Sequence, residues 1–454
     1  MFRSTSHTIS IHKTGLVLFF KSVDYITMTT PARLSAANAL HDVFAKGRRV
    51  REDWNKWLSP EDAGLAQAIL GLCLRRWGRL NAWCLPKLKD ASRGLPAETQ
   101  IALSIGLAQL AWLPGVATHA AVDESVSLVL QEKIGFPPHS GLVNAILRSA
   151  SGNRDALASE LDSTPDEADR SPFAELLLKA ALQDDLSSEN VRVLWGKLQR
   201  PPLPAFVVLS GEPPGGLVPD AQFPDARRLI PGTPFPTDWL RSGAGMVQDI
   251  SSQALMKFRW PFEKTPMRIL DVCAAPGGKT TMLAKMWPLA NIFAIEQNPR
   301  RAERLRENLA ARSVRAQIEV VESVAWMRSG GRPFDLILVD APCSASGTIR
   351  KHPELVWIYK RQEIERLVRV QENLIDAAVS RLSPGGLLIY SACSWFPEEG
   401  LNHLSRLESF NPKIKPALIW PDADGAALTH IFRPDPLTWD GEGFQGFAVT
   451  TASV

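Results

Sequence analysis

The sequence is poor in cysteine and contains no apolar run long enough to cross a membrane. Its five cysteines are odd in number and widely spaced, which argues against a disulfide framework and favours a reducing cytoplasm. There is no Cys-x-x-Cys pair and no cluster of Cys and His with metal-ligand spacing, so we expect no bound metal. The apolar stretch GLVLFF, residues 15–20, is too short for a membrane span or a signal-peptide core, so we expect no membrane partner.

Net charge is also small, but it is unevenly distributed. The 454 residues carry a formal charge of +3, and this length predicts two to three domains. Residues 151–190 hold ten acidic and three basic residues, which gives −7 locally and leaves +10 on the rest of the chain. A basic body allows a polyanionic partner such as a nucleic acid.

Hydrophobic patterning divides the chain into five segments. Apolar residues at three-to-four spacing predict an all-α bundle over residues 30–152, with one of its helices over 63–80. Over residues 243–452 the pattern alternates between strand and helix, which predicts an α/β domain with a parallel sheet covered on both faces. The other segments are predicted as a disordered or extension segment at 1–29, an acidic linker at 153–190 and a small α+β module at 191–242.

A glycine-rich loop follows the first strand of the C-terminal segment. In DVCAAPGGK, residues 271–279, Gly277 and Gly278 let the backbone approach a ligand closely. The spacing matches neither G-x-G-x-x-G nor the phosphate loop, which disfavours a dinucleotide or ATP. Glu296 ends the next strand, where a carboxylate typically binds ribose hydroxyls. A tight structural turn would explain the glycines alone, but with Glu296 they favour S-adenosylmethionine as the cofactor.

Two cysteines end strands of the same segment. Cys343 lies in VDAPCS and Cys393 in YSACS, and loops at the carboxyl ends of parallel strands converge over one ligand. Addition of a thiolate to carbon 6 of cytosine would make carbon 5 nucleophilic toward a methyl donor. An acid at ring N3, such as Asp340, would stabilise the adduct, and a second thiol would assist product release. The DAPC loop by itself leaves open which cysteine attacks.

The other cysteines and a basic cluster carry weaker signals. Cys73 and Cys84 lie on apolar helical patterns and are predicted as core residues, and Cys273 is predicted to pack rather than react. Basic and aromatic residues alternate after Asp340, which suits single-stranded nucleic acid or, equally, a solvated helix face. These residues are Arg350, Lys351, Trp357, Tyr359, Lys360 and Arg361.

Three motifs together resemble the RNA 5-methylcytosine methyltransferases of the Sun/Nol/NSUN superfamily. They are DVCAAPGGKT, DAPCSASGTIRKHPE and YSACSWFPEE, and GAGMVQDISSQ at 243–253 resembles the segment that opens that catalytic domain. The helical region with LVNAILR, residues 142–148, resembles the NusB-like RNA-binding domain of the bacterial 16S ribosomal RNA methyltransferase B branch. The resemblance spans residues 30–450 and implies a Rossmann-like class I methyltransferase domain. It also implies S-adenosylmethionine-dependent methylation of carbon 5 of a cytosine in 16S rRNA, free or in an assembling small subunit, and we expect a monomer.

The resemblance further implies roles for individual residues. Cys393 falls on the family's nucleophile, Cys343 on the thiol that releases the product, and Asp340 on the acid at the cytosine ring and the donor. Glu296 would bind the ribose, and Arg301 would support that turn. The remaining donor-binding positions are Cys273, Ala274, Ala275, Pro276, Gly277, Gly278 and Lys279 in the loop, and Ser323 near the adenine.

The chain departs from the family pattern at several of these positions. Glu296 stands where Asp is usual, Ala392 where Thr precedes the nucleophile, and the C-terminal GEGFQGFAVT lacks the usual Asp-Gly-Phe-Phe run. Ser323, or Glu322 with a one-residue slip, replaces an Asp near the adenine. A buried serine there would lose a charge-assisted contact of about 1–3 kcal/mol. We therefore predict weaker donor binding than in typical members, without loss of activity.

Two other functions are compatible with parts of the sequence. A DNA cytosine-5 methyltransferase also carries a Pro-Cys motif, with that cysteine as nucleophile. The second thiol at Cys393 and the lack of an evident target-recognition insertion argue against it. An RNA-binding protein that acts through the NusB-like domain, with a vestigial catalytic domain, is disfavoured by the intact Cys393, Cys343 and Asp340.

Overall fold

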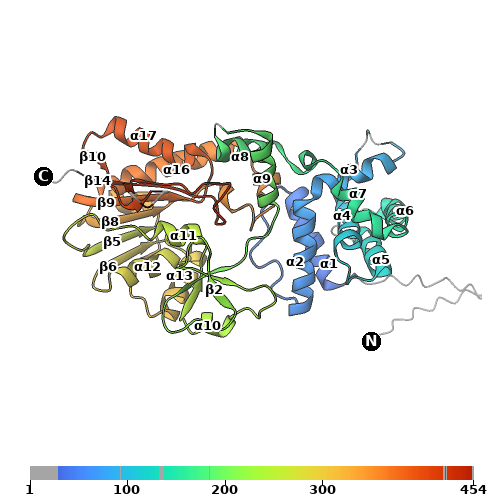
Figure 1. Ribbon diagram of the computed structural model, residues 1–454, viewed down its shortest axis with the longest axis horizontal. Coiled ribbons are helices and arrows are strands. Elements are labelled where there is room, and N and C mark those ends of the chain that lie inside the picture. The colour runs from blue at the N-terminus through green and yellow to red at the C-terminus, as the bar shows by residue number, and fades with distance from the viewer. Residues whose placement is uncertain are drawn as a thin grey trace, which may run out of the picture.

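The computed structural model describes residues 29–451 apart from 91, 93, 132–136, 184, 423, 424 and 426. The segment predicted to be disordered, residues 1–29, therefore lies almost wholly outside the described residues. A helical domain, a four-stranded sheet and a larger α/β domain follow one another along the chain (Figure 1). Within the described ranges no helix is both long and apolar enough to cross a membrane.

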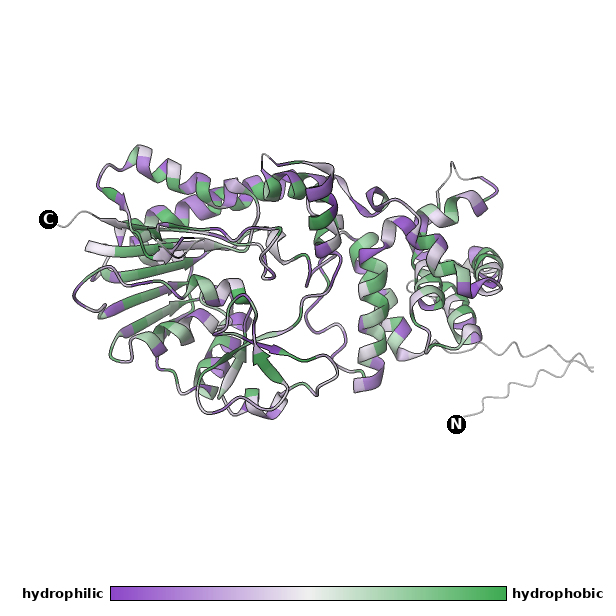
Figure 2. Ribbon diagram, viewed as in Figure 1, coloured by the Kyte–Doolittle hydropathy of each residue, from purple (hydrophilic) through white to green (hydrophobic). Residues whose placement is uncertain are grey.

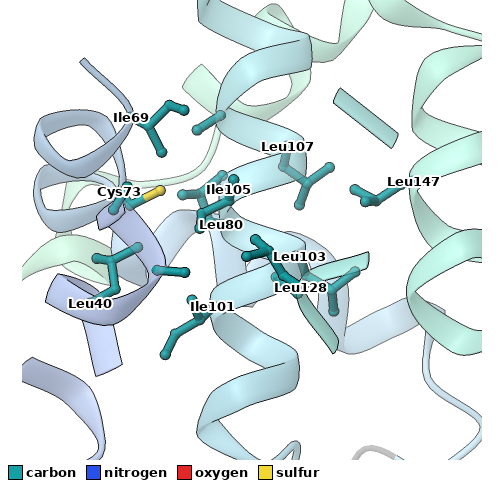
Figure 3. Close-up of a cluster of buried hydrophobic side chains, with 14 of the residues drawn as sticks. Leu40, Ile69, Cys73, Leu80, Ile101, Leu103, Ile105, Leu107, Leu128 and Leu147 are labelled. Carbon is teal, nitrogen blue, oxygen red and sulfur yellow. The ribbon is translucent and has the colours of Figure 1, made fainter. Parts of the chain in front are cut away.

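The helical domain is built around one central helix, α4. Residues 101–110 of α4 are buried without interruption, because this helix is apolar around its whole circumference. Leucine and isoleucine side chains from the surrounding helices meet it in the core, where Cys73 also lies (Figure 3). Cys73 and Cys84 are buried core residues, as their apolar pattern predicts. The helices are α1 (Pro31–Phe44), α2 (Pro60–Arg75), α3 (Trp77–Cys84), α4 (Ala97–Trp112), α5 (Thr118–Val129), α6 (Ser140–Ser151) and α7 (Arg154–Asp162).

The helix predicted over residues 63–80 is interrupted and forms α2 and α3. Gly78 in α3 lies against the 3-10 turn η4 (Asp166–Asp169), and a Cβ at this glycine would be 1.6 Å from the carbonyl oxygen of Ala168. The buried carboxylate of Asp169 accepts a hydrogen bond from the backbone N–H of Arg79 at 2.9 Å and pairs with its guanidinium. This long-range contact explains why the local periodicity did not predict the break.

The acidic segment 153–190 is packed against both large domains. Leu157 and Leu161 of α7 belong to the helical core. The helices α8 (Pro172–Leu182) and α9 (Ser188–Leu198) bury Phe173 and Trp195 in a cluster that includes Ile349 and Trp395 of the α/β domain. Figure 1 shows α8 and α9 between the two domains.

A small antiparallel sheet follows, with strand order β2-β3-β1-β4. Its last strand pairs with β1 and lies in the GAGMVQDISSQ motif, which the sequence placed with the catalytic segment. The elements are β1 (Ala205–Val208), β2 (Leu217–Pro219), β3 (Arg227–Leu229), α10 (Thr237–Arg241) and β4 (Gly245–Val247).

The large sheet has the order β10-β14-β9-β8-β5-β6-β7, with β13 paired to β14. The strands from β9 to β7 in this order are parallel, whereas β14 runs antiparallel to β9. The strands are β5 (Arg268–Val272), β6 (Asn291–Ile295), β7 (Gln317–Glu319), β8 (Phe334–Asp340), β9 (Leu382–Ala392), β10 (Ile414–Pro416), β13 (Ile431–Phe432) and β14 (Gln445–Thr451).

Helices cover both faces of this sheet. Successive strand residues point to opposite faces, so Ile337 packs toward α16 while Leu338 packs toward α12. Figure 2 shows the hydrophobic character of these strands. The helices are α11 (Ile250–Leu255), α12 (Gly278–Met286) and α13 (Pro299–Ala311) on one face, and α14 (Ser323–Arg328), α16 (Arg361–Ser380) and α17 (Leu401–Phe410) on the other. The predicted α/β class is confirmed. The antiparallel strands at one edge of the sheet were not part of the prediction.

Candidate active site

The candidate site lies where the carboxyl ends of the parallel strands meet. β8 and β9 pair in parallel, with Asp340 opposite Ser391 at their ends. Each strand continues into a loop that carries a cysteine, so the register places Cys343 and Cys393 side by side. This is the convergence that the strand-end argument predicted.

The two thiols are in direct contact. Sγ of Cys343 lies 3.3 Å from Sγ of Cys393, and both cysteines are free and partly buried. The hydrogen bond to Cys393, together with burial, raises the pKa of the Cys343 thiol well above its ordinary value. The contact therefore holds the two sulfur atoms at hydrogen-bond distance, and either thiol can be the donor.

Asp340 connects the cysteine loops to the glycine-rich loop. Its Oδ2 lies 2.7 Å from Nζ of Lys279, and its Oδ1 accepts a hydrogen bond from the Ser391 hydroxyl at 2.9 Å. Burial alone would lower the pKa of Lys279, but the neighbouring Asp340 carboxylate outweighs burial and raises it. Lys279 therefore stays charged and holds Asp340 at the edge of the sheet.

The predicted donor loop is a tight turn between β5 and α12. Gly277 has φ +100°, a conformation that disfavours any residue with a Cβ, and a Cβ there would lie 2.7 Å from a methyl group of Leu305. Arg301 Nη2 donates to the carbonyl oxygen of Ala275 at 2.9 Å, so this predicted support residue does contact the loop. Cys273 is nearly buried, and burial raises its pKa to about 12, which agrees with a packing role.

Two buried carboxylate oxygens beside this loop lack a hydrogen-bond donor. Oε1 of Glu296 accepts from the backbone N–H of Asn298, whereas Oε2 accepts none; Arg301 Nη1 is 3.3 Å away but lacks hydrogen-bond geometry. Oδ2 of Asp271 accepts from Thr280, whereas its Oδ1 has no partner. An unsatisfied buried acceptor is unfavourable. Both oxygens suit a ligand with hydroxyl and ammonium donors, as S-adenosylmethionine has.

Asp271 was not singled out from the sequence. Burial raises its pKa to about 7, because the carboxylate has no access to water. A carboxylate inside the apolar run MRILDV was a signal that could have identified it.

Ser323 and Glu322 lie at the start of α14 and differ in their surroundings. The Glu322 carboxylate is exposed and accepts hydrogen bonds from the backbone N–H groups of Val324 and Ala325 as a helix cap. Ser323 is buried at the first helical position. Of the two alternatives, Ser323 is thus the side chain that faces the interior.

After Asp340 the sequence allowed a surface for single-stranded nucleic acid or a solvated helix face, and the aromatic residues of this stretch form neither. The Trp357 indole N–H donates to the carbonyl oxygen of Leu74 at 2.8 Å, and its ring contacts that of Phe44 in the helical domain. Tyr359 stacks on Phe173 of α8. These rings hold the domains together, a contact that a local pattern of basic and aromatic residues could not reveal.

Several basic residues of the same stretch are also engaged. Arg350 is buried and pairs with Asp440, and Arg361 pairs with Glu398. Lys351 forms an ion pair with Glu442 at 2.6 Å. Lys351 and Lys279 are therefore both engaged by carboxylates in this structure.

A cleft adjoins this side of the site. It has a volume of about 1040 Å³ and lies between α2 and the loop of residues 350–354. The two cysteines are outside its lining, which reaches Lys351. Basic side chains in its lining are Arg51, Arg75, Arg76, Arg350, Lys351 and His352. In the part of the chain that the structure describes, no group of three or more His, Cys, Asp or Glu could hold a metal ion.

Both halves of the chain match known families. Residues 262–428 match the model of the 16S rRNA methyltransferase RsmB/F family, and residues 30–151 match the NusB family. The ribosomal RNA small subunit methyltransferase B of Klebsiella pneumoniae is 31% identical over 403 residues, 84% of this chain and 90% of that protein. Its namesake in Salmonella agona is 31% identical over 440 residues, 91% of this chain and 96% of that protein.

Solved structures share the fold. The crystal structure of PH0851 gives a TM-score of 0.66 at 18% identity and covers 93% of this chain and 99% of that chain. NSun6 from Pyrococcus horikoshii, solved with SFG, gives 0.51 at 16% identity and covers 63% of this chain and 99% of that chain. At these identities the likeness concerns the fold alone.

Proposed function

Since the chain belongs to the RsmB family of 16S rRNA methyltransferases, we propose that it methylates carbon 5 of a cytosine in 16S rRNA through a covalent adduct with Cys393. The observation that carries this proposal is the contact of two free thiols, 3.3 Å apart, beside the Asp340–Lys279 pair. The substrate is 16S rRNA, free or in an assembling small subunit, and the enzyme acts as a monomer in the cytoplasm.

Attack begins at Cys393. Its thiolate adds to carbon 6 of the cytosine, and the ring electrons make carbon 5 nucleophilic. Asp340, fixed by Lys279 and Ser391, contacts ring N3 and stabilises its protonated form as the adduct develops. Glu296 and the loop of residues 273–279 would hold S-adenosylmethionine, which would supply an electrophilic methyl group for carbon 5 and leave as S-adenosylhomocysteine.

Release reverses the addition. The proton on carbon 5 leaves to a water molecule, and the electrons of that carbon–hydrogen bond form the double bond between carbons 5 and 6. The carbon 6–sulfur bond breaks, and its bonding electrons return to Cys393. Cys343 lies against that sulfur, so its thiol is positioned to donate a hydrogen bond to the departing thiolate. We therefore assign the role of nucleophile to Cys393 and the role in release to Cys343.

The target cytosine has to leave any base stack to reach the thiols, as in other base-modifying enzymes. The adjoining cleft, with its basic lining, supports an approach of the RNA backbone from the side of Lys351. The NusB-like domain forms the opposite wall through α2.

Single-cysteine substitutions test the two roles. With 16S rRNA and a tritiated methyl donor, Cys393→Ala should show neither transfer nor adduct. Cys343→Ala should accumulate a protein–RNA adduct that survives a denaturing gel, because the departing sulfur loses its hydrogen-bond donor. Cys84→Ala, which removes a core thiol of the helical domain, is the control and should retain transfer.

The results of these two substitutions decide which cysteine attacks and which one assists release. An adduct in Cys393→Ala but not in Cys343→Ala would reverse the roles. Transfer to a DNA strand of the same sequence, without transfer to the RNA, would refute the substrate.

A further inference from the structure

A buried carboxylate lies behind both cysteine loops. Glu399, at the end of the 3-10 turn η6 (Pro397–Glu399), is fully buried. Sequence analysis gave it no role, since it is one of two adjacent glutamates in YSACSWFPEE. Its neighbour Glu398 lies at the surface and pairs with Arg361 at 2.6 Å. The two glutamates therefore have different environments despite their adjacency.

The carboxylate of Glu399 binds the residue that follows each catalytic cysteine. Its Oε1 accepts from the backbone N–H of Ser344 at 2.8 Å, and its Oε2 accepts from the Ser344 hydroxyl at 2.5 Å. The same Oε2 accepts from the Ser394 hydroxyl at 2.6 Å. One side chain thus joins the loops that carry Cys343 and Cys393.

A second set of contacts fixes the carboxylate itself. Gln371 of α16 donates from Nε2 to Glu399 Oε1 at 3.2 Å and to the carbonyl oxygen of Pro342 at 2.9 Å. The hydroxyl of Tyr390 donates to the Glu399 carbonyl oxygen at 2.7 Å. Behind Gln371, His403 of α17 lies 3.0 Å from its Oε1, and burial lowers the pKa of His403 to about 4. Neutral His403 can therefore donate to this oxygen and fix the orientation of the amide.

Among the described residues, all the groups that donate a hydrogen bond to Glu399 are neutral, and no ion pair with a cation offsets the cost of burying its charge. Four donors on two oxygens match the ionised form, which only accepts hydrogen bonds. The negative charge also contributes to the raised pKa of Cys343. The carboxylate therefore acts on both cysteine loops through hydrogen bonds, and on Cys343 also through its charge.

We propose that Glu399 is a positioning residue that holds the loops of Cys343 and Cys393 in register for the methyl transfer proposed above. The proposal rests on that transfer because it assigns Glu399 to the same two thiols. Ser394 transmits the restraint to Cys393, and Ser344 transmits it to Cys343. A change at Ser394 should therefore affect methyl transfer through Cys393, whereas a change at Ser344 should affect release through Cys343.

The test compares Glu399→Ala with Glu398→Ala, the same change at the adjacent surface position. A misplacement of about 1 Å near the reacting atoms can lower the rate about 100-fold. We expect Glu399→Ala to lower kcat by about this factor, while KM for the RNA and donor affinity change less than about threefold. Glu399→Gln, which keeps the shape and one acceptor oxygen, should recover part of kcat. Glu398→Ala should match the wild type.

Two serine variants keep the proposal testable if Glu399→Ala fails to fold. Ser394→Ala should slow methyl transfer without accumulation of adduct, because it loosens the loop of the attacking thiol. Ser344→Ala should accumulate adduct on a denaturing gel, because it loosens the loop of the release thiol. A destabilised fold would lower both steps together and would not divide them in this way.

The outcomes separate this proposal from the proposed function. If wild-type protein transfers methyl groups to 16S rRNA and Glu399→Ala folds with unchanged kcat, Glu399 is not a positioning residue. Serine variants that show the same defect would also overturn the proposal. If wild-type protein transfers no methyl group to RNA, the proposed function itself fails.

Discussion

Replacement of Asp271 by Asn should remove a pH-dependent loss of stability from the donor-binding half of the sheet. Burial raises the pKa of Asp271 from 3.8 to about 7. This shift of about three pKa units corresponds to about 4 kcal/mol, at about 1.4 kcal/mol per unit. Asparagine keeps an oxygen for the Thr280 hydroxyl, so Asp271→Asn removes the titration and retains the hydrogen bond.

The sign follows from proton binding. The folded protein holds this proton more tightly than the unfolded chain does, so the free energy of unfolding decreases as pH rises from about 4 to about 7. Above pH 7 Asp271 causes no further decrease in the free energy of unfolding. About 3 kcal/mol of the total decrease falls between pH 5 and pH 8. The variant lacks this contribution to the pH dependence. Its stability relative to wild type should therefore increase by about 3 kcal/mol between pH 5 and pH 8.

Guanidinium unfolding at pH 5 and pH 8, followed by tryptophan fluorescence without donor, measures this difference. The comparison of two proteins at each pH removes the contribution of other groups that titrate equally in both. If the variant and the wild type differ by the same free energy at both pH values, Asp271 does not titrate in this range and the reasoning is refuted.

Ser323→Asp restores a carboxylate at the buried start of α14, and we expect about tenfold tighter donor binding by calorimetry, which corresponds to about 1.4 kcal/mol. An unchanged affinity would contradict the predicted weakness of the donor site. Gly78→Ala should destabilise the helical domain by at least about 2 kcal/mol in thermal or denaturant unfolding, because its Cβ would overlap the Ala168 carbonyl. The control Gly64→Ala, on an open face of α2, should instead stabilise it by about 1 kcal/mol, and equal effects at both glycines would refute this reasoning.

The sequence predicted those parts of the site that depend on strand order. Cys343, Cys393 and Asp340 each follow or end a strand, and parallel strands bring such ends together whatever the detailed packing. The glycine loop was also predictable, because Gly277 needs a positive φ that most residues avoid. Residue spacing and strand order were therefore sufficient to predict where these residues lie.

Burial and contacts between distant segments were not predictable from local pattern. Nothing in the sequence separates buried Glu399 from exposed Glu398, since their difference arises from contacts with residues 28 and 55 positions away. From the sequence, Trp357 and Tyr359 suited a nucleic-acid surface or, equally, a solvated helix face, because their neighbours are basic. In the structure the helical domain and α8 cover them.

The Trp357 contact also bears on how this protein can be divided or recombined. Its indole reaches across to Leu74 and Phe44, and it follows in sequence from the loop that carries Cys343. A catalytic fragment cut free of the helical bundle would expose this ring and lose an anchor of that loop. The helical domain and the α/β domain are therefore not independently exchangeable. A chimera between related proteins should exchange α1, α2 and the segment around Trp357 together.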